Sequence, residues 1–202
     1  MFIFISVIKA ESDLPANVSA SVTTKSYNRT RTTALVEEPH FGRFDVRVGK
    51  IVHIEKHPDA DSLYIEKVDV GEEHPRTIIS ALVKHVAIEE MQNRSALFLV
   101  NLKPIKMRGV LSEGMIMCAL NENGTIEILI PPPGAESGEF VQVDGYERDP
   151  DDKIDVKKRV FEVVQRYLKT NDQRVATYKG KPWYVADKGI VMSPTLSNAT
   201  IR

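Results

Sequence analysis

The sequence predicts a mainly β protein whose centre is a small closed barrel. Short apolar segments recur between residues 44 and 143, and turn-forming segments rich in Pro, Gly, Asn and Asp separate them. The first apolar segment is the longest, and Gly49 interrupts it, which predicts a bulged and strongly bent strand. A long coiled first strand, several short strands and one short helix favour the five-stranded OB-fold barrel, which commonly binds oligonucleotides.

The elements of the barrel follow in chain order. FDVRV and KIVHIE form the first strand on either side of Gly49. The later strands are expected in LYIEKVDV, RTIISALV, SALFLVN, GMIMCAL, TIEILI and EFVQV. A short helix is expected near Val86 to Met91, between the third and fourth of these strands.

The character of the chain changes after Gly145. An acidic, turn-forming segment leads to Asp155, a good N-cap for a helix that runs to about Thr170. The apolar stripe of this helix consists of Val156, Val160, Val163, Val164, Tyr167 and Leu168. Short β segments follow in RVATYKG, KPWYVADKG and IVMS. This part is too small to fold alone, so we expect a small α+β extension packed on the barrel.

The chain therefore divides into three predicted parts. Residues 1–40 form a flexible N-terminal segment, because Ser, Thr and Asn dominate the stretch from Asn17 to Thr33. Residues 41–150 form the barrel domain, and residues 151–202 form the C-terminal extension.

The net charge of −1 over 202 residues conceals a strong asymmetry. Residues 109–152 contain 1 Lys or Arg against 10 Asp or Glu, whereas residues 153–181 contain 9 against 3. Charge patches attract polyanions even where the net charge is small, so this composition does not exclude an RNA partner.

The sequence favours a cytoplasmic protein. A single cysteine, Cys118, excludes an internal disulfide and indicates a reducing compartment, where this residue acts as a small buried hydrophobe. No apolar run approaches the ~20 residues of a membrane span, so no membrane partner is expected. The opening MFIFISVI resembles a short signal peptide but lacks a preceding positive charge, which leaves secretion as an alternative.

No pattern for catalysis, a cofactor or a metal stands out. The chain lacks GxSxG, HExxH, the phosphate-binding GxxxxGK[ST] and the dinucleotide glycine fingerprint. His57, Asp59 and Asp61 have a spacing that suits a cation, but Pro58 and Asp59 also begin a turn well without one. We predict a turn there, and a protein that is not an enzyme.

The segment Asn101 to Met115, NLKPIKMRGVLSEGM, is the strongest candidate for a binding site. Pro104, Gly109 and Gly114 prevent one regular helix or strand. The expected phosphate contacts are Lys103, Lys106 and Arg108. Two further candidates, Asn101 and Ser112, either contact RNA or cap a turn.

Further basic residues extend this candidate surface. They are Lys50, Lys56 and Lys84 around the barrel and Lys157 and Lys158 on the extension. Together such residues make an electrostatic groove that follows a phosphate backbone. The predicted barrel has few aromatic residues, which favours recognition of RNA by shape over stacking on single strands.

NLKPIKMRGVLSEGM and HPDADSLYIEKVDVGE closely resemble the C-terminal tRNA-binding domain of the endothelial monocyte-activating polypeptide family. The similarity continues through SALVKH, MQNR, ATYKG and LSNATIR and spans about Phe41 to Arg202. Ala81 stands where relatives commonly carry glycine. Similar domains form the C-terminal part of animal tyrosyl-tRNA synthetase and of the auxiliary protein of the multisynthetase complex.

This resemblance implies an OB-fold and a non-catalytic tRNA-binding module that delivers tRNA to an aminoacyl-tRNA synthetase or to the multisynthetase complex. It also implies a monomer, because the extension would occupy the barrel surface through which stand-alone bacterial relatives dimerise. A secreted cytokine-like polypeptide is the alternative, since RVGKIVH partly matches a heptapeptide linked to that activity. Fusion to a synthetase, the choice of synthetase and any preference for a tRNA species stay open.

Overall fold

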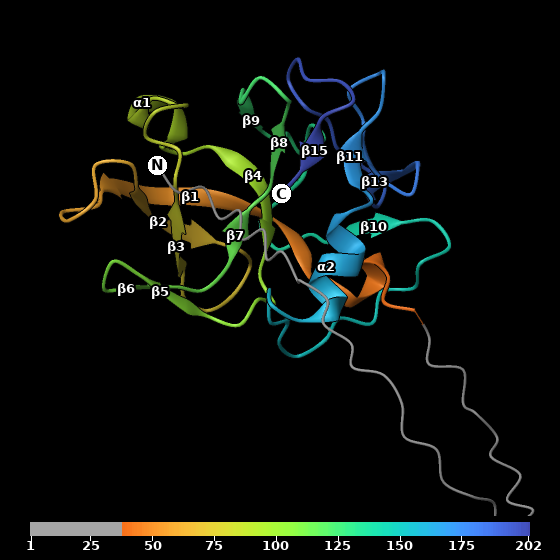
Figure 1. Cartoon of the computed structure of the whole chain (residues 1–202), viewed down its shortest axis with the longest axis horizontal. Helices are drawn as coiled ribbons and strands as arrows, with labels where there is room; N and C mark the ends of the chain where they lie inside the picture. The colour runs from red at the N-terminus through yellow and green to blue at the C-terminus, as the bar shows by residue number, and fades with distance from the viewer. Residues whose placement is uncertain (1–37) are drawn as a thin grey trace, which may run out of the picture. The chain divides into compact units, whose positions relative to one another are not determined.

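Five antiparallel strands form a nearly closed barrel in the computed structural model, which describes residues 38–202 (Figure 1). They are β1 (Val46–Lys56), β2 (Tyr64–Asp69), β3 (Arg76–Ser80), β4 (Ser95–Leu99) and β7 (Met115–Ile116), in the order β3-β2-β1-β4-β7. Near the open edge, the N–H of Glu113 donates to the carbonyl of Thr77 at 2.9 Å. The predicted mainly β, OB-like barrel is confirmed.

The bulge of β1 lies at a different residue from the one predicted. The pairing with β2 shifts between Ile51 and His53, which places the extra residue at Val52 and not at Gly49. Gly49 instead lies against the ring of Phe98, where a Cβ would come within 2.7 Å of Cδ2. A glycine is needed there because the ring leaves no room for a side chain.

The barrel interior is apolar except for one polar pair, Glu66 and Ser80. Ile51, Val68, Ile78 and Phe98 are fully buried. Among them Glu66 has an exposed fraction of 0%, and the hydroxyl of Ser80 donates to its carboxyl group. Burial raises the pKa of Glu66 to about 7.

Cys118 is buried in the same cluster, as predicted, and burial raises the pKa of its thiol to about 12. A thiol in that environment stays protonated and unreactive at neutral pH.

The helices are short. They are the 3-10 helix η1 (Phe41–Arg43), α1 (Ile88–Met91) near its predicted place, and α2 (Arg159–Gln165). The predicted helix from Asp155 to about Thr170 is therefore wrong at both ends. The Asp155 carboxylate accepts a hydrogen bond from the Lys157 N–H at 2.9 Å and forms a turn ahead of α2, while Leu168 already belongs to a strand.

A second sheet joins the extension to the barrel. It contains β8 (Cys118–Leu120), β9 (Ile126–Ile128), β10 (Val141–Val143), β11 (Leu168–Thr170), β12 (Ala176–Tyr178), β13 (Lys181–Val185), β14 (Gly189–Ile190) and β15 (Thr200–Ile201). The segment GMIMCAL, predicted as one strand, divides between β7 and β8 at Met117, whose N–H donates to the carbonyl of Leu97 in β4 and whose carbonyl accepts from the N–H of Leu129. Strands on both sides of residue 150 thus share one sheet, in which β10 pairs with β13.

The extension packs on the outer face of the barrel through one continuous core. Buried residues of β1 and β4 meet buried residues of α2 and of the second sheet. The principal members are Val46, Val48, Leu97 and Leu99 from the barrel and Phe161, Val164, Tyr178, Trp183 and Ile201 from the extension. The rings of Phe41 and Trp183 lie 4.9 Å apart between their centroids. The predicted extension is confirmed as part of the same folded unit.

The first 37 residues lie outside the described part of the chain, and with them most of the predicted flexible segment 1–40 and the opening MFIFISVI. Within residues 38–202, no helix has the length and apolar character needed to span a membrane.

Candidate nucleic-acid interface

The middle of the segment Asn101 to Met115, which holds half of the predicted site residues, folds as a short β-hairpin. β5 (Ile105–Met107) pairs with β6 (Val110–Ser112), and Arg108 and Gly109 form the turn between them. Both turn residues have positive φ, 49° for Arg108 and 93° for Gly109. Two positive φ angles are characteristic of a type I′ turn, whose twist matches that of the paired strands. Arg108 is thereby presented at the tip of the hairpin.

The hairpin is anchored on the outer face of β2 and β3. Met107 and Val110 form one cross-strand pair and pack on Leu63, Ile65 and Ile79. Lys106 and Leu111 form the neighbouring pair, and alternation along the strands directs them to the opposite face. Both of these side chains are exposed. One face of the hairpin therefore holds it in place, and the other presents a basic residue to solvent.

Ser112 belongs to the anchor. Its exposed fraction is 3%, its hydroxyl oxygen accepts a hydrogen bond from the Ile79 N–H at 3.0 Å, and the hydroxyl donates to the carbonyl of Gly114 at 3.1 Å. These bonds favour the turn-capping alternative for Ser112 over an RNA contact.

Asn101 is also a structural residue. Its amide N–H groups donate to the carbonyls of Arg43 and Asp151, both at 2.9 Å, and its carbonyl oxygen accepts from the Asp45 N–H at 3.0 Å. Both amide donors are occupied, and the side chain is buried. These bonds favour an internal role for Asn101 over an RNA contact.

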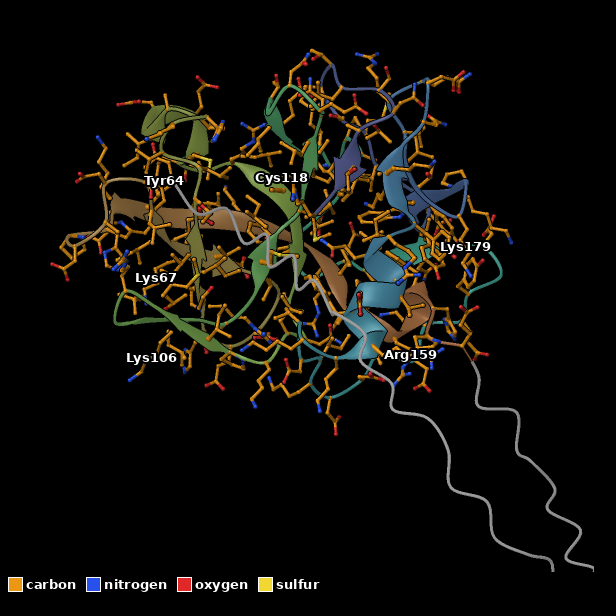
Figure 2. All side chains as sticks on the ribbon, in the orientation of Figure 1. Tyr64, Lys67, Lys106, Cys118, Arg159 and Lys179 are labelled. Carbon is orange, nitrogen blue, oxygen red and sulfur yellow. The ribbon has the colours of Figure 1, made fainter. Side chains whose placement is uncertain are left out.

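The basic residues of this segment do reach the surface. Lys103, Lys106 and Arg108 are all exposed. Among the described residues, no ion pair engages any of them. Figure 2 shows Lys106 at the lower left of the molecule, on the side of the barrel, and Lys67 of β2 lies above it on the same side.

Lys67 is a basic residue that sequence reasoning did not select. It lies in register with His53 of β1 and with Thr77 of β3, and its ammonium group donates to the Thr77 hydroxyl at 2.8 Å. The sequence did contain a signal for Lys67. Side chains alternate between the two faces of a strand, so Lys67 in LYIEKVDV lies on the same outward face as Ile65.

The remaining barrel lysines lie in two places. Lys56 ends β1 opposite Tyr64, whose hydroxyl donates to the carbonyl of Val86 in the loop that also contains Lys84. Lys56 and Lys84 therefore lie at one end of the barrel. Lys50 lies farther along β1, in register with Asp69, so a carboxylate accompanies it.

Lys157 and Lys158 immediately precede α2 and are exposed. They belong to the extension, whose segment around Ile154 lies beside Lys103, since the Lys103 N–H donates to the carbonyl of Ile154 at 2.8 Å.

The comparisons with known proteins identify the family. A family model described as a putative tRNA-binding domain matches residues 46–140, which include the whole hairpin β5–β6. The crystal structure of the C-terminal domain of Plasmodium vivax p43 has 35% sequence identity and a TM-score of 0.73, and the match covers 80% of this chain and 98% of that one. The chain belongs to this tRNA-binding domain family.

Curated relatives agree with this assignment and with the resemblance found in the sequence. The aminoacyl tRNA synthase complex-interacting multifunctional protein 1 of Mus musculus is 50% identical over 160 residues, which cover 79% of this chain and 51% of the relative. The cytoplasmic tyrosine–tRNA ligase of Danio rerio is 51% identical over 140 residues, which cover 68% of this chain and 26% of the ligase. The chain thus spans about half the length of the first relative and about a quarter of the second.

Several arginines of this tRNA-binding domain are committed to internal ion pairs. Asp45 binds Arg47 at 2.7 Å and Arg148 at 2.9 Å, and Glu72 binds Arg76 at 2.6 Å. Burial opposes ionisation of Asp45, but the hydrogen bonds from the two arginines outweigh burial and lower its pKa. These arginines hold the start of β1, the β2–β3 turn and the segment after β10 together.

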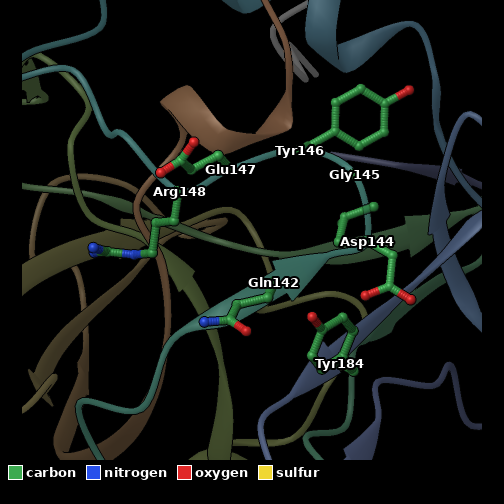
Figure 3. Close-up of a pocket in the computed structure, with 8 residues that line it drawn as sticks. Gln142, Asp144, Gly145, Tyr146, Glu147, Arg148 and Tyr184 are labelled. Atoms are coloured by element: carbon green, nitrogen blue, oxygen red, sulfur yellow. The ribbon is translucent and has the colours of Figure 1, made fainter.

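A hollow of about 480 Å³ lies beside this network (Figure 3). Gln142, Asp144, Tyr146, Glu147, Arg148 and Tyr184 line it. A hydrogen bond with Asp144 raises the pKa of the Tyr184 hydroxyl. The guanidinium of Arg148 is already bonded to Asp45 and lies 3.7 Å from the ring centroid of Phe140. Two carboxylates at its edge make this hollow unfavourable for a phosphate.

The segment HPDADS folds as the predicted turn. The N–H of Asp59 donates to Nδ1 of His57 at 3.0 Å, and the N–H of Leu63 donates to the carbonyl of Ala60 at 3.0 Å. Within the described residues, no group of three or more His, Cys, Asp or Glu side chains suits a metal ion.

Proposed function

We propose that this chain is a non-catalytic module that binds tRNA and delivers it to an aminoacyl-tRNA synthetase or to a complex of synthetases. The observation that carries this proposal is the hairpin β5–β6. It belongs to the segment matched by the tRNA-binding family, and it presents Lys106 and Arg108 on a face that the anchor residues do not use. Lys103 extends the basic surface towards the extension, because its N–H donates to the carbonyl of Ile154 at 2.8 Å.

The chemistry of this surface suits the phosphate backbone and not individual bases. The guanidinium of Arg108 forms two parallel hydrogen bonds to one phosphate, and the lysine ammonium groups act as point charges. Such contacts position RNA without reading its sequence. A grip of this kind increases the local concentration of tRNA for a linked synthetase without any new contact between enzyme and substrate.

The extension supports a monomeric protein in this role. Val46, Val48, Leu97 and Leu99 form an apolar face on the barrel, and residues of the extension cover it within one chain. In this proposal the extension takes the place of a dimer partner, and the protein acts in the cytoplasm, where synthetases and tRNA meet.

The structure offers less support for the cytokine-like alternative. The heptapeptide RVGKIVH, residues 47–53, lies within β1, which is paired with β4 on one side and with β2 on the other. Of its side chains only Lys50, Val52 and His53 are exposed. A partner that reads this peptide as an extended segment would have to open the barrel first.

Two measurements test the proposal. Bulk tRNA should bind more tightly than an RNA duplex of matched length, and equal affinity for both would argue against a tRNA-binding role. Delivery is tested by fusing the chain to the catalytic core of a tyrosine–tRNA ligase. The fusion should lower the KM for tRNA and leave kcat unchanged, whereas a fusion carrying Lys106→Ala and Arg108→Asn should not.

A further inference from the structure

The extension carries a second hairpin with the same turn as β5–β6. β12 and β13 are joined by Lys179 and Gly180, with φ of 49° and 79°, and the pair Tyr178 and Lys181 closes the turn. A basic residue followed by glycine therefore forms the tip of both hairpins. This second tip lies in the motif ATYKG, which the proposed grip of the barrel does not use.

An exposed tyrosine lies beside this tip. The N–H of Lys179 donates to the carbonyl of Tyr167 at 3.3 Å, and its ammonium nitrogen lies 4.9 Å from the centroid of the Tyr167 ring. The ring of buried Tyr178 meets Tyr167 edge-on, at 6.2 Å and 88°. Tyr167 nevertheless has an exposed fraction of 37%. The ring is thus oriented by its neighbours and still accessible to solvent.

A second tyrosine–lysine pair continues the surface. The ammonium nitrogen of Lys181 lies 5.3 Å from the ring centroid of Tyr146 and donates to the carbonyl of Asp144 at 3.0 Å. The rings of Tyr146 and Tyr178 are 4.8 Å apart, so the two pairs adjoin. We name Tyr146, Tyr167, Lys179 and Lys181 the extension patch. Its two lysines end the segment 153–181, in which 9 basic residues stand against 3 acidic ones.

A rigid aromatic ring beside lysines is the combination that binds unpaired nucleotides. Bases of any identity stack on an aromatic face, and neighbouring cations take the phosphate. A duplex does not satisfy such a site, because its bases are already stacked and paired. The patch therefore differs in kind from the hairpin β5–β6, which offers charge without an exposed aromatic ring.

We propose that the extension patch binds an unpaired nucleotide of the RNA, with the base stacked on Tyr167 and the phosphate held by Lys179. This inference rests on the proposed tRNA-binding function. Figure 2 shows Lys106 and Lys179 on opposite sides of the folded part of the chain. One RNA that reaches both therefore contacts the protein at two separate points, and the second contact adds to the affinity of the first.

The test compares three variants of the full chain on bulk tRNA and on a blunt RNA duplex of matched length. Tyr167→Ala should weaken tRNA binding about fivefold or more and leave duplex binding unchanged, because only the stacked base is lost. Tyr167→Phe should restore tRNA affinity, since the ring is retained. Lys179→Asn removes the charge and keeps a residue that tolerates positive φ, and it should also weaken tRNA binding.

The outcomes separate this inference from the function on which it rests. If the parent chain binds tRNA no better than the duplex, the proposed function fails. If the parent prefers tRNA but Tyr167→Ala binds it equally well, only the extension patch is overturned. Equal losses on tRNA and duplex, or a loss with Tyr167→Phe as large as with Tyr167→Ala, would also overturn stacking. Thermal unfolding of each variant establishes that the fold is intact.

Discussion

The side-chain carbonyl of Asn101 accepts a hydrogen bond from the backbone N–H of Asp45 at 3.0 Å, across 56 positions of the chain. The same amide bonds the carbonyls of Arg43 and Asp151, so one side chain joins η1, the start of β1 and the segment that leads into the extension. Asp45 in turn binds Arg47 and Arg148. Asn101, at the start of the basic segment, therefore connects the barrel to the extension through hydrogen bonds.

Replacing Asn101 with alanine should destabilise the protein. The change leaves three backbone groups without their partner, of which the Asp45 N–H is buried, and each unsatisfied buried group costs about 1–3 kcal/mol. We expect the free energy of unfolding in urea to fall by about 2–4 kcal/mol. Folded protein should keep its tRNA affinity. A stable variant that has lost tRNA binding would show instead that Asn101 contacts RNA.

Changing Lys106 to alanine and Arg108 to asparagine should weaken tRNA binding at least about tenfold, which corresponds to about 1.4 kcal/mol. Asparagine is chosen at Arg108 because φ there is 49°, a conformation that alanine adopts poorly. The slope of log affinity against log salt concentration should also become shallower, since fewer phosphates are contacted. Filter binding at several salt concentrations measures both quantities.

The matched control for this pair is Lys188→Gln, which removes an exposed positive charge from the turn between β13 and β14. It should leave tRNA affinity within about twofold, because the Lys188 ammonium already pairs with the Glu139 carboxylate at 4.0 Å and a surface ion pair of this kind contributes little. If this control weakens binding as much as the hairpin variant, the interaction depends on overall charge and not on the hairpin. Thermal unfolding of both variants should stay within a few degrees of the parent.

Because of Glu66, the barrel should be more stable in mild acid than at neutral pH. Its pKa is raised to about 7 from 4.5, so the folded state binds a proton that the unfolded state has lost between these values. Stability therefore falls as pH rises from about 4.5 to 7, by on the order of 3 kcal/mol. Glu66→Gln should remove this dependence and be more stable than the parent at pH values above 7.

Urea unfolding of parent and Glu66→Gln chains in mildly acidic and mildly alkaline buffers measures the effect. The difference between the two proteins isolates Glu66 from Asp45, whose lowered pKa acts at a lower pH. Parallel pH profiles for the two proteins would mean that Glu66 stays ionised in the folded barrel.

Truncation after Asp152 should expose the apolar face formed by Val46, Val48, Leu97 and Leu99. A patch of this kind favours self-association, since each fully buried side chain contributes roughly 1.5–3 kcal/mol before entropy is counted. The intact chain should sediment as a monomer, and the truncated chain should dimerise, aggregate or unfold. It should also bind tRNA less tightly, because Lys157 and Lys158 are lost. A stable, monomeric and fully competent truncated chain would show that the extension is dispensable.

The candidate site was predictable where charge and exposure coincide. Lys106 and Arg108 carry charges that are costly to bury, and Gly109 beside them indicates a turn, so sequence alone places them at a surface bend. Asn101 and Ser112 were not separable in this way, because a neutral polar side chain serves equally well as a ligand or as an internal hydrogen-bond partner. Tyr167 was not predicted as a site residue, because the sequence placed it in the apolar stripe of a longer helix. In the structure that helix ends at Gln165.

The sequence by itself determined the mainly β barrel, the position of most strands along the chain, the burial of Cys118 and the exposure of the basic residues near Arg108. These follow from the periodicity of apolar residues and from turn chemistry, which are local properties. Only the tertiary structure decided which polar side chains face inward, where β1 bulges, and that Met117 leads the chain from one sheet into another. Those features depend on contacts between residues far apart in the chain, such as Phe98 against Gly49 and the hydrogen bond from Asp45 to Asn101. No local sequence pattern encodes such distant contacts.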